Sequence, residues 1–105
     1  FNYVDDVVDA FLLASTNNSA IGKAFNLGST EVVTLMQLAE VMTANAGGRY
    51  ELKTFPEDRK KIDIGDYYSD YTLITDTLGW QPKIALADGL ARSFDYFKVN
   101  MDKYL

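Results

Sequence analysis

The 105-residue sequence contains no cysteine and no histidine. Without cysteine the chain has no disulfide, no thiol nucleophile and no cysteine-based zinc site. Without histidine it lacks the commonest metal ligand and the side chain most used for proton transfer near neutral pH. These two absences exclude most metal centres and much acid–base and nucleophilic chemistry, and we expect no metal site.

Long hydrophobic runs are missing as well. No apolar stretch approaches the roughly 18 residues that a membrane span needs, and no basic-then-apolar leader resembles a signal peptide. We therefore expect a cytoplasmic protein with no membrane partner. Hydrophobic residues make up 48% of the sequence and charged residues 24%, close to the average of globular proteins. This composition favours a single domain, or a piece of one, over residues 1–105.

The charge of the chain is acidic but uneven. The net charge of −5 disfavours nonspecific binding to nucleic acid, which depends on neutralising phosphates. Residues 49–61 nevertheless carry five basic and three acidic side chains, a local net charge of +2 against −7 for the remainder. An anionic small ligand would approach this segment, although a short charge run such as residues 59–61 is also typical of a solvated loop.

Hydrophobic periodicity predicts four helices. Asp5 is placed to cap the first, which should end in the polar residues 17–19. Thr34 and Gln37 have the spacing of a capping box and start a second helix that ends at Gly47. Apolar residues at steps of three and four predict a long amphipathic helix from Leu86 to the C-terminus.

The remaining predicted helix is short and has a signal at both ends. Ser69 or Asp70 can accept hydrogen bonds from the free amides of its first turn. Gly79 can take the left-handed conformation that ends a helix, Trp80 can fold back onto the last turn, and Pro82 prevents the helix from resuming. We assign Trp80 to the structural core.

Short strands are expected between these helices, at residues 1–4, 24–27 and 50–55, where aromatic, β-branched or alternating side chains gather. Residues 57–64 read as a charged surface connection. The predicted fold class is therefore α/β, with about half of the residues in about four helices and a few short strands.

Asp5 and Asp6 are adjacent carboxylates, a pattern that invites an acid–base pair. Adjacent residues of a helix point about 100° apart and do not share a proton site. Asp5 as a cap, with Asp6 and Asp9 favourably placed near the positive end of the helix dipole, accounts for all three without catalysis.

Three blocks of motifs cover nearly the whole chain. They are Phe1-x-Tyr3-Val4-Asp5-Asp6, then Ala24-Phe25-Asn26-Leu27-Gly28, and finally Ile64-Gly65-Asp66 with Tyr68-x-Asp70, Leu78-Gly79-Trp80-x-Pro82 and Leu86-x-x-Gly89-Leu90. In this order they resemble the C-terminal part of the NAD-dependent epimerase/dehydratase family, the extended short-chain dehydrogenase/reductases that act on nucleotide sugars.

The resemblance implies a helix-rich, substrate-side fragment of an extended Rossmann-type enzyme. The parent enzyme would oxidise a sugar carbon by hydride transfer to NAD(P), held by a Rossmann portion upstream of this chain, and then rearrange the keto intermediate. The outcome stays open among epimerisation, dehydration and decarboxylation, as do the sugar and the base. The implied partners are a nucleotide-diphosphate sugar, the N-terminal Rossmann portion and, as an open alternative, a second copy of the enzyme.

The resemblance also implies the substrate-binding residues. Family members commonly hold the diphosphate with an arginine before the Gly-Asp pair, often two residues before the glycine, where this chain has Asp63. Arg59 is then the nearest candidate. Asp66 and Tyr67 fall at the nucleotide end of the pocket, as ribose or phosphate neighbours. Asp66 could equally cap a turn, and tyrosines beside a helix start often serve packing instead.

The family's catalytic tyrosine and lysine stand four residues apart, and no tyrosine of this chain has a lysine four positions later. The glycine-rich dinucleotide turn is absent too. We therefore expect no catalytic and no cofactor-binding residue in residues 1–105 and no activity from the chain alone. The alternative is a noncatalytic module that binds a nucleotide sugar or another protein.

Overall fold

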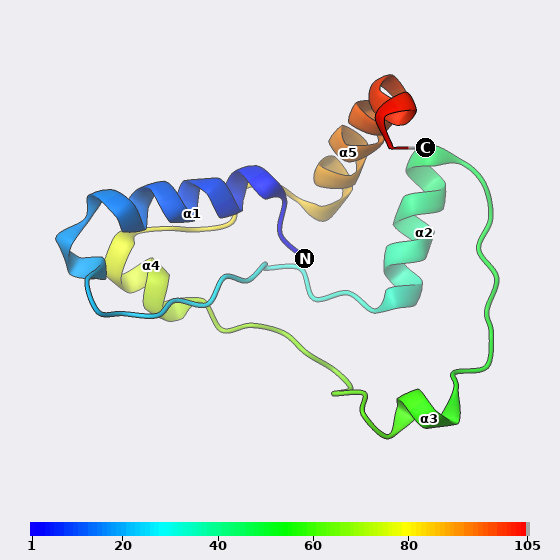
Figure 1. Cartoon of the computed structure of the whole chain (residues 1–105), viewed down its shortest axis with the longest axis horizontal. Coiled ribbons are helices and arrows are strands. Elements are labelled where there is room, and N and C mark those ends of the chain that lie inside the picture. The colour runs from blue at the N-terminus through cyan, green and yellow to red at the C-terminus, as the bar shows by residue number, and fades with distance from the viewer. Residues whose placement is uncertain (105) are drawn as a thin grey trace.

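The computed structural model describes residues 1–104 (Figure 1). Its elements are α1 (Val4–Thr16), the 3₁₀ turn η1 (Asn18–Ala20), α2 (Leu35–Ala46), α3 (Glu57–Lys60), α4 (Thr72–Leu78), α5 (Leu86–Asn100) and the 3₁₀ turn η2 (Met101–Lys103). The expected share of about half the chain in helices is confirmed. About four helices were expected, and residues 1–104 contain five, because the charged connection after Pro56 forms a helical turn of its own.

The helices form two groups that the chain joins by long loops. On one side α1, η1 and α4 lie together, and on the other α2 packs against α5. The segment between α2 and α4 carries α3, which lies away from both groups (Figure 1). The helices therefore frame an open arrangement.

The core lies between α1 and α4. It consists of Ala10, Ile74, Leu78 and Trp80, of which Trp80 is 2% exposed. Gly79 ends α4 with φ +70°, and the Trp80 ring then meets Tyr71 edge-on at 5.9 Å between centroids. The predicted helix stop and the structural role of Trp80 are confirmed.

Asp6 is the buried polar centre of this core, 2% exposed. Its carboxylate accepts the backbone amides of Lys83 and Ile84, both at 3.1 Å. Its own carbonyl accepts the indole N–H of Trp80 at 2.8 Å. The side chain of Lys83 also pairs with Asp9 at 2.8 Å, and the hydrogen bond and charge of Asp9 raise the pKa of Lys83.

These contacts correct the expectation for the two neighbouring aspartates. Helix α1 begins at Val4 with Tyr3 at the N-cap, so Asp5 is not the cap. Asp5 lies at the surface, where its carboxylate is 3.9 Å from Arg92. Asp6 stands in the first turn as expected, but its hydrogen bonds reach across the sequence to residues 80–84.

The starts of α2 and α4 match their local signals. The hydroxyl of Thr34 accepts the amide of Gln37 at 3.2 Å, and the side chain of Gln37 accepts the amide of Thr34 at 2.8 Å, which confirms the capping box. Asp70, and not Ser69, accepts the amide of Thr72 at 2.8 Å. Side-chain and backbone hydrogen bonds from Thr72 lower the pKa of Asp70.

The expectation of short strands is wrong for the part of the chain that the structure describes. Residues 24–27 and 50–55 contain no assigned strand, and residue 4 already belongs to α1. A strand needs a neighbour that completes its ladder of hydrogen bonds, and side-chain preference alone does not supply one. Within residues 1–104 the fold is helical.

The structure exposes more surface than a compact domain of its size. Its accessible surface is 8407 Å², whereas the scaling for folded monomers gives about 5,900 Å² at 11.8 kDa. Its radius of gyration is 17.0 Å, against about 13 Å for a compact domain. Large side chains such as Val4, Phe11 and Leu12 of α1 are exposed.

Among residues 1–104, no helix has the length and apolar composition needed to cross a membrane.

We expect Asp6→Asn to destabilise the protein by about 1–3 kcal/mol, because one of the two buried amides loses its acceptor. Asp6→Ala removes both acceptors and should cost more. The matched control is Asp5→Asn, whose exposed ion pair should contribute less than about 1 kcal/mol. Urea denaturation measures all three, and equal midpoints for Asp5→Asn and Asp6→Asn would contradict the role of Asp6.

Candidate functional site

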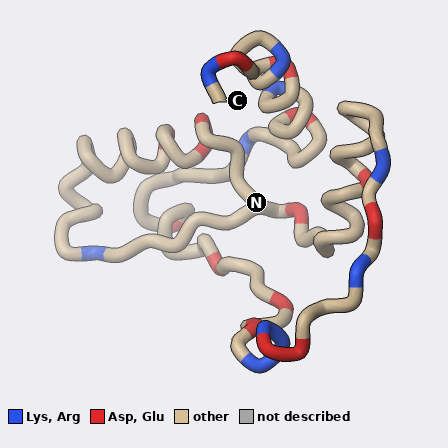
Figure 2. Tube along the Cα trace, turned by 45° about the vertical axis from the view of Figure 1, so that its right-hand side comes forward, with Lys and Arg blue, Asp and Glu red and all other residues tan. Residues whose placement is uncertain are grey.

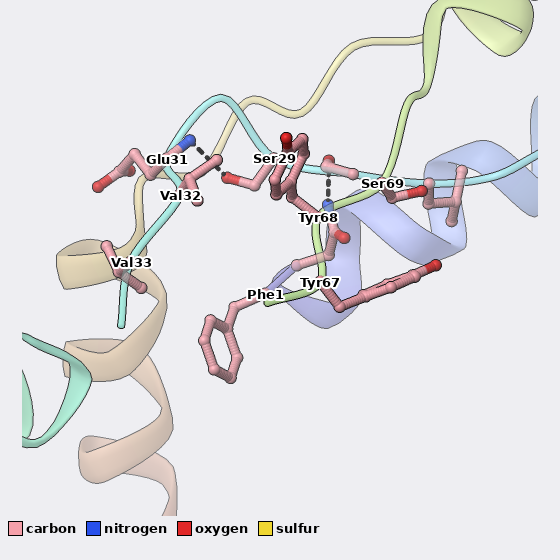
Figure 3. A pocket seen from close by; sticks show the side chains of 11 residues that line it. Phe1, Ser29, Glu31, Val32, Val33, Tyr67, Tyr68 and Ser69 are labelled. Atoms are coloured by element: carbon pink, nitrogen blue, oxygen red, sulfur yellow. Dashed lines mark hydrogen bonds between the residues drawn. The ribbon is translucent and has the colours of Figure 1, made fainter. Parts of the chain in front are cut away.

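A hollow lies where the N-terminus, the segment before α2 and the segment before α4 come together. Its cavity volume is about 690 Å³, and we call it the tyrosine pocket. It is lined by Phe1, Val32, Val33, Thr34, Leu35, Met36, Asp63, Gly65, Asp66, Tyr67 and Tyr68. A smaller hollow of about 180 Å³ adjoins it and shares Phe1, both valines and both tyrosines. Figure 3 shows the smaller hollow, with Phe1 on one segment of the backbone and Tyr67 and Tyr68 on the segment beside it.

Gly28 brings the two walls of this site together. A Cβ atom at position 28 would lie 2.7 Å from the carbonyl oxygen of Ser69 and 2.7 Å from Cδ1 of Tyr71. The absence of a side chain therefore permits a contact that no other residue allows. On the other side, Asn2 donates a hydrogen bond to the carbonyl of Gly28 at 2.6 Å. These contacts hold the N-terminus and the segments around residues 28 and 69 next to one another.

Asp66 and Tyr67, the two residues expected beside the ribose or phosphate of a ligand, both line the tyrosine pocket. They follow a turn in which Gly65 has φ +70° and its amide donates to the carboxylate of Asp63 at 3.3 Å. Asp63, and not Asp66, therefore holds the turn. The carboxylate of Asp66 stays exposed at the pocket, where it can accept hydrogen bonds from the hydroxyl groups of a ligand.

The tyrosines divide between two roles. Tyr67 and Tyr68 are each 73% exposed and present their rings to the hollow, while Tyr71 packs against Trp80. The packing interpretation thus describes Tyr71. Tyr67 and Tyr68 offer two accessible aromatic faces that can stack on a planar or partly apolar ligand.

Arg59 lies apart from this pair. It belongs to α3, and within residues 1–104 it lines neither hollow. The α3 turn carries acidic residues beside its basic ones (Figure 2), and Lys60 pairs with Glu57 at 3.8 Å. The structure brings Asp66 and Tyr67 together without Arg59, whose contact with a phosphate stays a prediction.

The sequence interpretation missed the other wall of the site. Val32 and Val33 line both hollows, and Ser29 and Glu31 line the smaller one. A signal was present, because Gly28 marks a turn directly after the apolar block 24–27, and loops at such turns often carry binding residues. Phe1 also lines both hollows, and its signal was its place in the first block of motifs.

Comparison with known proteins defines the class to which the chain is related. It is 32% identical over 96 residues to UDP-glucose 4-epimerase of Mycolicibacterium smegmatis, covering 91% of this chain and 30% of that protein. It is 32% identical over 106 residues to GDP-L-fucose synthase 1 of Arabidopsis thaliana, covering 96% of this chain and 30% of that protein. It is also 30% identical over 107 residues to UDP-glucuronic acid decarboxylase 1 of Danio rerio, covering 97% of this chain and 23% of that protein.

These relatives are members of the NAD-dependent epimerase/dehydratase family, so the resemblance found in the sequence is confirmed. The chain spans between 23% and 30% of the length of the curated relatives it matches. It is therefore homologous to a part of these Rossmann-type enzymes. No protein-family model matches the chain, and no solved structure matches it significantly.

We expect Gly28→Ala to destabilise the protein by about 1–3 kcal/mol, because the new methyl group must displace the Ser69 backbone or the Tyr71 ring. The control is Gly89→Ala in α5, where the nearest atom to a new Cβ is the Tyr3 side chain at 3.1 Å. There the better helix propensity of alanine, up to about 1 kcal/mol, offsets the tighter contact. Thermal denaturation compares the two, and a Gly28→Ala variant as stable as Gly89→Ala would refute the close approach at Gly28.

Proposed function

We propose that residues 1–105 form the substrate-side portion of an NAD-dependent nucleotide-sugar epimerase or dehydratase, an enzyme similar to UDP-glucose 4-epimerase. In this proposal the tyrosine pocket is one wall of the site for a nucleotide-diphosphate sugar. An N-terminal Rossmann portion, outside this chain, supplies the other wall and holds NAD(P). The whole protein acts in the cytoplasm as an isomerase or lyase that passes through an oxidised sugar.

One observation carries the proposal. The three blocks that resemble the family begin at residues 1, 24 and 64, yet all three supply residues to the two adjoining hollows. Phe1 comes from the first block, Leu27 and Gly28 from the second, and Asp66 from the third. Motifs that converge on one hollow, in a chain related to nucleotide-sugar enzymes, favour a shared binding role over separate structural roles.

By charge and shape, each of these side chains suits a different part of the ligand. Asp66 can accept hydrogen bonds from ribose hydroxyl groups, and Tyr67 can stack on the base or the sugar ring. A carboxylate repels phosphates, so the diphosphate must lie toward the basic segment, where the Arg59 guanidinium can contact two phosphate oxygens at once. α3 lies on a long surface loop (Figure 1), and we propose that the ligand draws this loop toward the tyrosine pocket.

NAD(P) does not fit the residues of this chain. A dinucleotide needs a glycine-rich turn that opens a helix behind a strand, and residues 1–104 contain no such strand. Hydride transfer therefore belongs to the Rossmann portion, and this chain binds and orients the sugar nucleotide. The extra exposed surface of the chain, about 2,500 Å² above the scaling for a compact monomer, favours its being covered by that portion or by a second copy of the enzyme.

We expect the 105-residue chain alone to show no turnover and no measurable NAD binding, because neither a Tyr-x-x-x-Lys pair nor a dinucleotide turn is present. The natural protein, expressed with its upstream residues, should convert a nucleotide sugar. Absorbance at 340 nm detects NADH formed by either protein, and chromatography of UDP- and GDP-sugars detects conversion of the sugar. Redox activity of the 105-residue chain would refute the division of roles.

We expect Arg59→Ala to weaken binding of UDP to the natural protein by about tenfold, because one bidentate phosphate contact is lost. Tyr67→Ala should weaken it to a similar degree by removing a stacking face. Arg49→Ala, an arginine of the same basic segment, is the control and should bind nearly as the unsubstituted protein does.

Isothermal titration with UDP, repeated with GDP, measures these affinities. If Arg59→Ala and Arg49→Ala bind equally well, Arg59 is removed from the site. If Tyr67→Ala also binds like the unsubstituted protein, the tyrosine pocket does not hold the nucleotide.

A further inference from the structure

Helix α5 begins without a cap of its own. Its N-cap residue is Ala85, which has no side-chain acceptor for the free amides of the first turn. The acceptor comes instead from a distant residue, because the carboxylate of Glu31 accepts the amide of Leu86 at 2.9 Å. A carboxylate at this position also interacts favourably with the positive end of the helix dipole.

Glu31 belongs to the loop that forms one wall of the candidate site. Its neighbours Val32 and Val33 line the tyrosine pocket, and its own amide donates to the hydroxyl of Ser29 at 3.2 Å. Glu31 lines the edge of the smaller hollow, but in Figure 3 its carboxylate points away from Tyr67 and Tyr68. The side chain thus turns outward to α5 while the loop turns inward to the pocket.

The loop has few other attachments along this stretch. Its start is held by Asn2 at Gly28, and its end is held by the capping box of α2 at Thr34. Between these two points the bond from Glu31 to Leu86 is the one long-range hydrogen bond that the described residues provide. The amides of Lys83 and Ile84, just before α5, are held by Asp6, so the partner of Glu31 is itself fixed to the core.

We propose that Glu31 is a positioning residue of the nucleotide-sugar site, which holds the wall at Val32 and Val33 in place by capping α5 and does not touch the ligand. This inference rests on the proposed function, since it concerns the affinity of that same site. It predicts that the donor, the amide of Leu86, matters for ligand binding as much as Glu31 does.

The test is a double-substitution cycle in the natural protein, with UDP and GDP as probes. Glu31→Ala removes the acceptor. Leu86→Pro removes the donor, and proline is well tolerated at the first position of a helix, where Ala85 already has the extended conformation that proline requires of its predecessor. Each substitution should weaken binding by about three- to tenfold, and the double variant should be no weaker than either single one.

Two further variants complete the experiment. Glu31→Gln keeps an oxygen acceptor and should recover most of the lost affinity, whereas Glu40→Ala, an exposed glutamate of α2, should bind as the unsubstituted protein does. In a turnover assay Glu31→Ala should raise KM by the same three- to tenfold factor and leave kcat nearly unchanged. Hydrogen exchange should become faster at residues 29–33 in both Glu31→Ala and Leu86→Pro.

Three results would overturn the inference. Unchanged affinity in Glu31→Ala would remove Glu31 from any role in the site. A loss in Glu31→Ala with unchanged affinity in Leu86→Pro would show that Glu31 touches the ligand itself. If the unsubstituted protein binds neither UDP nor GDP, the proposed function fails, which is distinct from the first two results because those require binding by the unsubstituted protein.

Discussion

The structure depends on the way one aspartate joins the first helix to a segment more than seventy residues away. Asp6 accepts the Trp80 indole with its carbonyl and the amides of Lys83 and Ile84 with its carboxylate. Closing so long a loop costs conformational entropy. The hydrogen bonds of Asp6, two of them to its carboxylate, together with the burial of Trp80, offset this cost. They place α1 against α4, and they fix the chain just before α5.

The candidate site follows from this closure. With the first block of motifs tied to the last, the N-terminus comes beside Gly28 and Ser69, and the tyrosine pocket forms between segments that are distant in the sequence. The same arrangement leaves the pocket open and much apolar surface exposed. An open hollow with an acidic rim at Asp66 and a basic segment on a nearby long loop fits the proposal that a second portion of the protein covers the ligand.

The features that could be predicted from the sequence are those set by residues close together in the chain. The capping box at Thr34 and the stop at Gly79 are set by residues within one turn, and both are confirmed. Asp6 and Glu31 could not be assigned from the sequence, because their partners lie 77 and 55 residues away. The strand at residues 24–27 was predicted from side-chain preference, whereas a strand exists only when another backbone pairs with it. Of the candidate site, Asp66 and Tyr67 were found through a family motif, while the opposite wall had only the signal of Gly28.

The most direct test of the central claim is a crystal structure of the natural protein, including its upstream residues, with a UDP-sugar bound. We expect the nucleotide in the tyrosine pocket, with its ribose near Asp66, its diphosphate facing the segment around Arg59, and the sugar extending toward a nicotinamide held by the upstream portion. A nucleotide bound elsewhere, with the tyrosine pocket filled by side chains of the upstream portion, would contradict it.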